Sequence, residues 1–407
     1  MTETILKTIS KRKILAGILG LGLLALSACG GGSSSSGPAP PLPNSQKGSL
    51  ELPTSYNPGD CYITTGTTTS TCNSPDLLTT GSSSITALAA YSAVSSSSPN
   101  VLFWGDAAGD IDSATAASSP TSITSCTSTS LATPVLALAV VPPSSSSGLP
   151  NGEIFYATSG GTYAAALASG ACSTSVLSSP TTVISQVPTV LAYNASANQV
   201  IGISGDDLYY SCTPVSSGQT CTSQGTLPGL VDTSPQITAI ASDPQLPIVY
   251  VLAIGVSTGR IYPYLVNSNG TLTSLGNYNG NELQNPVGLT LFQGDNGAQS
   301  YCSTQQCTFL DVLNKGNDTV TQYIVTYSTS STGLPTGVSI NQFNNAYTSC
   351  EMIQPSAIAA LPLPASSGTL NKPEVFIGEG GIQTGPCLGG TATSFGNNIT
   401  AYDINGE

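Results

Sequence analysis

Short apolar segments rich in Ala, Ile, Val and Leu recur along the chain, roughly every 50 residues. Each has the length of a buried strand and is too short for an amphipathic helix. Most of them follow a proline directly or nearly so. The segments are ITALAAY at 85–91, VLALAVV at 135–141, TVLAYNA at 189–195, ITAIASD at 237–243, VGLTLFQ at 287–293 and SAIAALP at 356–362. This spacing predicts a repeated unit that begins with a strand.

The unit that begins at residue 237 shows its parts most clearly. Its first segment is followed by IVYVLAI at 248–254, RIYPYLV at 260–266 and TLTSLGNY at 271–278. Asn269-Gly270 separates the last two, and Asn-Gly is the strongest short-range hairpin signal. The same plan recurs at 199–227 and 307–340. We therefore expect four short antiparallel strands in each unit.

Repeated four-stranded units predict an all-β fold, specifically a β-propeller over residues 47–407, because a closed ring leaves few free sheet edges. The small residues of the first strands suit a crowded central channel. An array of β-sandwiches is the alternative. The last unit reaches Glu407 before a fourth strand. A strand near residues 47–52 would fill that edge, unless loops cover it.

The N-terminal segment has the features of an export signal. Basic residues at positions 7–13 precede an uncharged segment at 14–28, which is short for a transmembrane helix. Leu26-Ser27-Ala28-Cys29 resembles the bacterial lipobox, which implies cleavage after residue 28 and lipidation of Cys29. Acyl chains would anchor the protein, since each buried methylene contributes about 0.8 kcal/mol. An ordinary signal peptide that contains a cysteine is the alternative.

Residues 29–46 are rich in Gly, Ser and Pro and are expected to be a disordered tether. The glycines after Cys29, where an aspartate would retain a lipoprotein at the inner membrane, are compatible by resemblance with export to an outer membrane. We therefore expect a cell-envelope protein that is attached to a membrane through its lipid.

The charge of the chain limits its partners. The formal net charge is −13 and only 7% of residues are charged. Beyond the signal the basic residues are Lys47, Arg260, Lys315 and Lys372, which are too scattered to form the basic stripe that nucleic acid requires. The low charge is compatible with life in an acidic medium, and also with simple drift toward a Ser/Thr-rich secreted composition.

Histidine is absent from the sequence. This excludes Ser-His-Asp and Cys-His catalysis and His-ligated zinc. No cofactor and no metal ion are expected.

The cysteines indicate that the chain is cross-linked by disulfides. There are 11, so lipidation of Cys29 leaves an even number in an exported chain, which favours disulfides. Proximity suggests three pairs, and the remaining cysteines could form two more. The expected pairs are Cys61 with Cys72, Cys212 with Cys221, Cys302 with Cys307, Cys126 with Cys172 and Cys350 with Cys387.

Residues 235–343 resemble a family, the lactonase-like seven-bladed propellers. The resemblance lies in a proline, an apolar strand, an Asp-Pro turn and two strands with tyrosines. The matching residues are Pro235, Asp243-Pro244, Val249-Tyr250-Val251, Ile261-Tyr262, Tyr264, Gly270 and Leu272. The match is weaker over 355–407 and before 230. It implies seven blades, with a strand from Leu50 as the candidate seventh first strand.

The resemblance also implies catalysis by His, Arg and Glu facing the channel, but this chain lacks histidine and has Arg260 as its blade arginine. Lactonase activity is therefore not favoured. If a carboxylate were catalytic, the candidates would be Glu282, Glu351, Glu374 and Glu379, and no spacing distinguishes one of them. No catalytic residue is assigned.

Two other residue groups leave alternatives open. Asp106, Asp110 and Asp112, and likewise Asp206 and Asp207, could bind calcium but lack its loop pattern, so turn capping is favoured. Tyrosines gather in the clearer units and could form a contact surface or simply pack across strands; they are Tyr209, Tyr210, Tyr250, Tyr262, Tyr264, Tyr278, Tyr323 and Tyr327.

The sequence thus favours a lipid-anchored envelope propeller that binds a protein or glycan without catalysis. A divergent lactonase-like hydrolase is the alternative.

Overall fold

The computed structural model describes most of the chain beyond residue 82. The described residues are 50–51, 63–65, 78–80, 83–92, 100–115, 123–126, 130–144, 149–178, 180–215, 219–232, 234–255, 259–280, 282–295, 306–342, 354–361, 374–380, 383–385, 393–395 and 398–404. The predicted signal peptide, the tether and Cys29 lie outside them. By its internal contacts the chain divides into Met1–Ser45 and Gln46–Glu407, and only the second unit contains described residues.

Five sheets are each built from consecutive antiparallel strands. Blade 1 is β4 (Ile85–Tyr91), β5 (Val101–Asp106), β6 (Ile111–Thr115) and β7 (Ile123–Ser125). Blade 2 is β8 (Ala137–Val141), β9 (Glu153–Thr158), β10 (Gly161–Ala166) and β11 (Thr181–Ile184), with a 3-10 turn at Val176–Ser178 before β11. Blade 3 is β12 (Val190–Asn194), β13 (Gln199–Ile203), β14 (Leu208–Thr213) and β15 (Thr220–Thr226).

Blade 4 is β16 (Gln236–Ser242), β17 (Ile248–Ile254), β18 (Gly259–Val266) and β19 (Leu272–Ser274), with β20 (Tyr278–Gly280) also paired to β18. Blade 5 is β21 (Pro286–Asp295), β22 (Gln306–Asn314), β23 (Thr319–Thr329) and β24 (Pro335–Gln342). These bounds confirm the strands that the sequence predicted at 199–227, 237–278 and 307–340.

A further sheet, the closing sheet, combines both ends of the unit. Its C-terminal part is β25 (Pro355–Ala360), β26 (Glu374–Glu379) and β29 (Asn398–Ile404), and its N-terminal part is β1 (Leu50–Glu51), β2 (Ile63–Thr65) and β3 (Leu78–Thr80). β1 pairs antiparallel with β29, with Leu50 opposite Ile404. The prediction that a strand near residues 47–52 would fill the last edge is therefore confirmed. A small separate hairpin is formed by β27 (Gln383–Gly385) and β28 (Thr393–Phe395).

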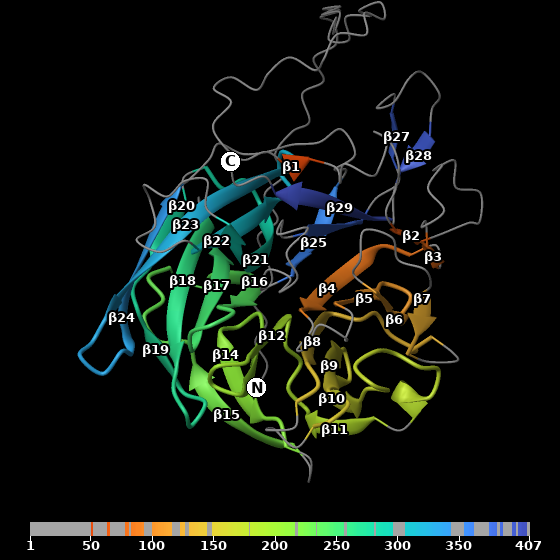
Figure 1. Cartoon of the computed structure of the whole chain (residues 1–407), viewed down its shortest axis with the longest axis horizontal. Coiled ribbons are helices and arrows are strands. Elements are labelled where there is room, and N and C mark those ends of the chain that lie inside the picture. The colour runs from red at the N-terminus through yellow and green to blue at the C-terminus, as the bar shows by residue number, and fades with distance from the viewer. Residues whose placement is uncertain are drawn as a thin grey trace, which may run out of the picture. The chain divides into compact units, whose positions relative to one another are not determined.

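The first strands of the sheets form a ring, as Figure 1 shows. In order, β4, β8, β12, β16, β21 and β25 each contact the next, and β25 contacts β4. This closed order of radial sheets, five of them fully antiparallel, confirms the predicted all-β propeller. Within the described residues six first strands are found, as in the sequence. The seventh implied by the resemblance is not found there, because Leu50 lies at the outer edge of the closing sheet and heads no blade.

Three junctions between blades use the same two-residue step. Successive strand residues point to opposite faces, so a Leu or Ile on a first strand packs against the preceding blade and the small residue after it faces the next blade. Clusters at three junctions show this directly: Leu191 packs with Ala139, Ile240 with Ala192 and Leu289 with Ala241. A large side chain against a small one fills the space between two sheets at native density.

Polar side chains add links between blades. The Thr86 hydroxyl of blade 1 donates to the Val135 carbonyl at 2.6 Å, and the Ser356 hydroxyl of the closing sheet donates to the Ile85 carbonyl at 2.6 Å. Asn194, at the end of β12, donates from its amide to the carbonyls of Leu246 and Ile248 in blade 4, at 2.9 and 3.0 Å. These bonds join a side chain of one blade to the main chain of another, in addition to the main-chain hydrogen bonds within each blade.

The Asn269-Gly270 turn forms as its sequence predicted. Gly270 has φ +80°, and the Asn267 N–H donates to the Thr271 carbonyl at 2.9 Å. A Cβ at residue 270 would lie 2.0 Å from the Ser211 hydroxyl oxygen, so glycine is also required for the approach of blade 3.

Candidate functional site

The first strands enclose a central cavity of about 470 Å³. Each contributes residues from the middle or the second half of the strand. Ser92, Pro142, Ala195 and Pro244, which follow the ends of four of these strands, also line the cavity, so it lies toward the end of the ring where the strands finish. We call this the exit end. The lining is Leu88–Ser92, Leu138–Val140 with Pro142, Leu191–Tyr193 with Ala195, Ile240–Pro244, Leu289–Leu291 and Ile358–Ala360.

The wall of the cavity is mostly aliphatic and contains several small residues. The position after the Leu or Ile is alanine in every first strand except β21, where it is Thr290. The Thr290 hydroxyl accepts a hydrogen bond from the Ala360 N–H at 3.0 Å. Each first strand is also the end strand of its sheet, so one edge of its main chain faces the channel without a strand partner.

Tyr91 and Tyr193 stand near the exit end with their hydroxyls engaged. The Tyr91 hydroxyl donates to the Gly170 carbonyl at 2.6 Å, and the Tyr193 hydroxyl donates to Asn198 Oδ1 at 3.1 Å. Their rings are therefore fixed in place, and the mouth has a preformed outline.

Asp243 is the charged residue of the lining. Its Oδ1 accepts the N–H groups of Gln245 and Leu246 at 2.9 and 2.8 Å, and its Oδ2 accepts the hydroxyl of Tyr327 from blade 5. Burial raises the pKa of the Asp243 carboxyl, while these hydrogen bonds act in the opposite direction. The Asp-Pro turn that carried the family resemblance thus links blades 4 and 5, and its carboxylate is already committed.

The remaining catalytic candidates are dispersed. Arg260, on β18, pairs with Asp232 at 3.0 Å, and the Tyr262 hydroxyl donates to the same carboxylate at 2.9 Å. Glu282 accepts from the hydroxyls of Tyr278 and Tyr323. Neither Arg260 nor Glu282 lines the cavity.

The other glutamates do not change this picture. Glu379 is buried at the end of β26, outside the lining. Glu374 begins β26, and Glu351 lies outside the described residues.

The tyrosines that the sequence left open are core residues. Most are almost completely buried: Tyr209, Tyr210, Tyr250, Tyr262, Tyr264 and Tyr323. Tyr278 and Tyr327 are half-buried. Several hold a loop carboxylate with the hydroxyl, as Tyr262, Tyr323 and Tyr327 do. Packing, and not an exposed contact surface, is their role.

Of the aspartates at 106–112, Asp106 caps a turn. Asp106 Oδ1 accepts the N–H groups of Ala108 and Asp110 at 3.0 and 2.8 Å. Asp207 occupies a left-handed conformation (φ +65°) in the turn before β14. Within the described part of the chain, no group of three or more His, Cys, Asp or Glu side chains could hold a metal ion.

Three buried carboxyls have strongly raised pKa values, and the sequence did not single out two of them. Burial raises the pKa of Asp112, Glu153 and Asp311 to about 7 in each case. Hydrogen bonds from Ser125, Gln219 and Gln322, respectively, limit the rise. The available signal was a charged residue inside or beside an apolar strand, as in CTFLDVL for Asp311 and EIFYAT for Glu153.

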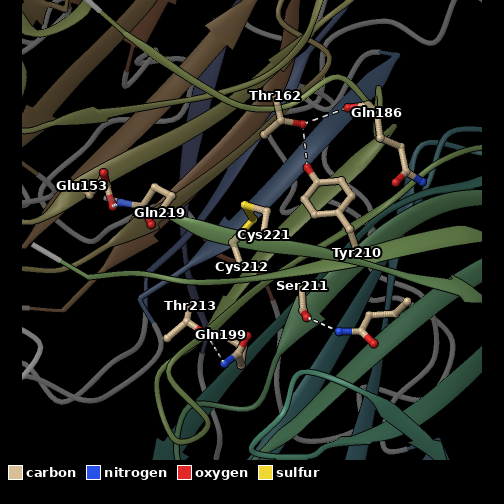
Figure 2. Close-up of a disulfide and its surroundings, with 11 residues drawn as sticks. Glu153, Thr162, Gln186, Gln199, Tyr210, Ser211, Cys212, Thr213, Gln219 and Cys221 are labelled. Carbon is tan, nitrogen blue, oxygen red and sulfur yellow. Dashed lines mark hydrogen bonds between the residues drawn. A yellow bond between two sulfur atoms is a disulfide. The ribbon is translucent and has the colours of Figure 1, made fainter. Parts of the chain in front are cut away.

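Two disulfides are described, and both are pairs that the sequence suggested. Cys126–Cys172 joins the residue after β7 of blade 1 to the segment between β10 and β11 of blade 2, and Cys212–Cys221 joins β14 to β15. Figure 2 shows the second beside the Gln219–Glu153 contact, which links blade 3 to blade 2. Cys61, Cys72, Cys302, Cys350 and Cys387 lie outside the described residues, and the side chain of Cys307 is not described.

No family model matches this chain, and no curated protein matches it. Solved structures that resemble it include U3-55K (10% identity, TM-score 0.41, covering 79% of this chain and 96% of that chain). Others are the WD40 repeats of RRP9 (10%, 0.41, 79% and 95%) and the WD40 β-propeller domain of Doa1 (10%, 0.38, 80% and 94%). The fold assignment rests on the sheet order and ring closure of this chain. The lactonase-like resemblance stays a prediction.

Within the residues that the structure describes, no helix has the length and apolar character to cross a bilayer.

Proposed function

We propose that this protein is a lipid-anchored propeller of the cell envelope, held at the outer membrane through Cys29, that binds a protein or glycan partner without catalysing a reaction. The anchor is supported by the lipobox-like Leu26-Ser27-Ala28-Cys29 and the tether after it. The fold supports the binding role, because a rigid ring positions many surface loops.

The observation that carries the non-catalytic part is the state of the charged groups. Hydrolysis of a lactone requires a base or nucleophile and a group that stabilises negative charge within reach of one substrate. Arg260 is neutralised by Asp232, and Glu282 is held by two tyrosines, both away from the cavity. Asp243, which does line the cavity, is occupied by two N–H groups and a hydroxyl.

The anchor is tested by fractionation of cells that express the wild type or Cys29→Ser. We expect the wild type in the outer-membrane fraction and the variant to be depleted from it, because the variant lacks the thiol that carries the lipid. Equal amounts of both proteins in the outer-membrane fraction would contradict the anchor.

The binding role is tested by cross-linking in intact envelopes, followed by identification of the captured partner. The matched control is a chain of residues 1–49 alone, which keeps anchor and tether but lacks the propeller. A partner captured only by the whole chain supports the proposal. Turnover of any member of a lactone panel by the whole chain would refute the non-catalytic part.

A further inference from the structure

We propose that the central cavity is a binding site for one small uncharged molecule with a largely apolar body and a few hydrogen-bonding groups. This site is separate from the loop surface that would meet a protein or glycan, so it does not depend on the function proposed above.

Size and lining support a ligand site. Small-molecule pockets are typically about 300–1,000 Å³, with mostly apolar walls and a few placed polar groups. The cavity of about 470 Å³ falls in this range, and the residues that line it are mostly aliphatic.

The charges of the lining select against ions. Burying an unpaired charge is costly unless a counter-charge or strong hydrogen bonds replace water. The cavity has no basic residue in its lining, so an anion would find no partner there. The Asp243 carboxylate is already bonded, so a cation would have to compete with Tyr327 and two N–H groups.

The polar groups that remain suit a neutral ligand. A hydroxyl has one donor and two acceptor sites. Thr290 uses an acceptor site for the Ala360 N–H, which leaves its proton for a bound molecule. The open main-chain edges of the first strands supply further donors and acceptors around the same space.

The test uses two fluorescent probes with similar aromatic bodies: neutral phenylnaphthylamine and anionic anilinonaphthalene sulfonate. Both are titrated into the full-length chain carrying Cys29→Ser, so that acyl chains and detergent do not contribute to the signal. We expect saturable one-to-one binding of the neutral probe, and binding of the sulfonate that is weaker by roughly tenfold or more.

Two variants test whether the neutral probe binds in the cavity. Ala195→Trp adds bulk at an exposed position of the mouth, and Ala90→Phe narrows the half-buried wall. The matched control is Ala108→Trp, at an exposed alanine in the turn between β5 and β6. That turn is at the opposite end of the ring, where the neighbouring Ala107 N–H bonds to Ser84 before β4 begins. Thermal unfolding followed by circular dichroism shows whether each variant is folded.

A loss of affinity of roughly tenfold in Ala195→Trp or Ala90→Phe, with the control unchanged, supports the cavity as the site. The proposal is wrong if the neutral probe does not bind saturably or if the sulfonate binds as tightly. It is also wrong if both folded variants bind like the wild type.

Discussion

Replacing the buried carboxyl of Asp311 by an amide should stabilise the propeller at neutral pH and reduce the dependence of its stability on pH. Asp311 is 0% exposed on β22, opposite Thr290 of β21 and Gln322 of β23. Its strand neighbours Phe309 and Leu313 pack toward the closing sheet. Asp311→Asn keeps the shape of the side chain and removes the charge.

The expected magnitude follows from the pKa of the carboxyl. Burial raises the pKa of Asp311 from its ordinary 3.8 to about 7 in the folded protein. The folded state therefore binds this proton more tightly than the unfolded chain, and stability is greatest below about pH 4 and falls as the pH rises toward 7. The difference corresponds to on the order of 4 kcal/mol at pH 8, which is an upper value for the gain from the amide.

The assay is urea unfolding at pH 4 to 8, followed by the fluorescence of Trp104. It is the single tryptophan of the chain and is 1% exposed, so its emission reports on the folded core. We expect the free energy of unfolding of the wild type to fall with rising pH. The free energy of unfolding of Asp311→Asn should fall less steeply with pH. It should match that of the wild type near pH 4 and exceed it by up to a few kcal/mol at pH 8.

Asp206→Asn is the control, because it removes the same formal charge from an exposed turn. A smaller effect of this variant separates burial from the general repulsion of an acidic chain. The reasoning fails if Asp311→Asn is less stable than the wild type at pH 8. It also fails if the free energy of unfolding depends on pH equally steeply in both proteins, because the carboxyl is then not a buried charge.

Two further predictions concern links between and within blades. Replacing both Cys126 and Cys172, which are 46 residues apart, by serine should lower the free energy of unfolding by about 4 kcal/mol. The same change at Cys212 and Cys221, which are 9 residues apart, should lower it by about 2.5 kcal/mol, because the disulfide closes a shorter loop. The reverse order of the two losses in urea unfolding would contradict this explanation by loop entropy. Asn194→Ala removes a side-chain donor from the Leu246 and Ile248 carbonyls, which keep the main-chain N–H groups of Ile248 and Asp243, and should cost roughly 0.5–1.5 kcal/mol. A melting temperature equal to that of the wild type would contradict a stabilising link between blades 3 and 4.

The strands and their order were predictable because local signals agreed. Apolar segments of strand length alternated with turns such as Asn269-Gly270, and a local hairpin needs no distant partner to form. The closing strand at Leu50 was also predictable, because the last unit lacked a strand and a closed ring requires one.

The roles of the tyrosines could not be read from their pattern. A period of two predicts which residues share a face, but both faces of a blade are covered by its neighbours. Tyr250 and Tyr262 are therefore as buried as the aliphatic residues beside them. The partner of Arg260 was hidden for another reason, because Asp232 lies in the preceding loop and meets it only when blade 4 has folded.

The cavity and its chemistry were partly foreseeable. Alanines in the first strands indicated a crowded axis, but the commitment of Asp243 to Tyr327 joins residues 84 positions apart on different blades. Such long-range hydrogen bonds are set by the packing of whole sheets and leave no local trace in the sequence.

The shared packing step between blades affects how this protein could change in evolution. Since three successive junctions between blades are made by the same large-against-small contact, duplication or deletion of one of these units would leave matching surfaces on the neighbouring blades. The number of blades in the propeller is then set by where the two chain ends meet and by how many units fit around the axis. Descendants with more or fewer blades could arise without a new kind of junction between blades.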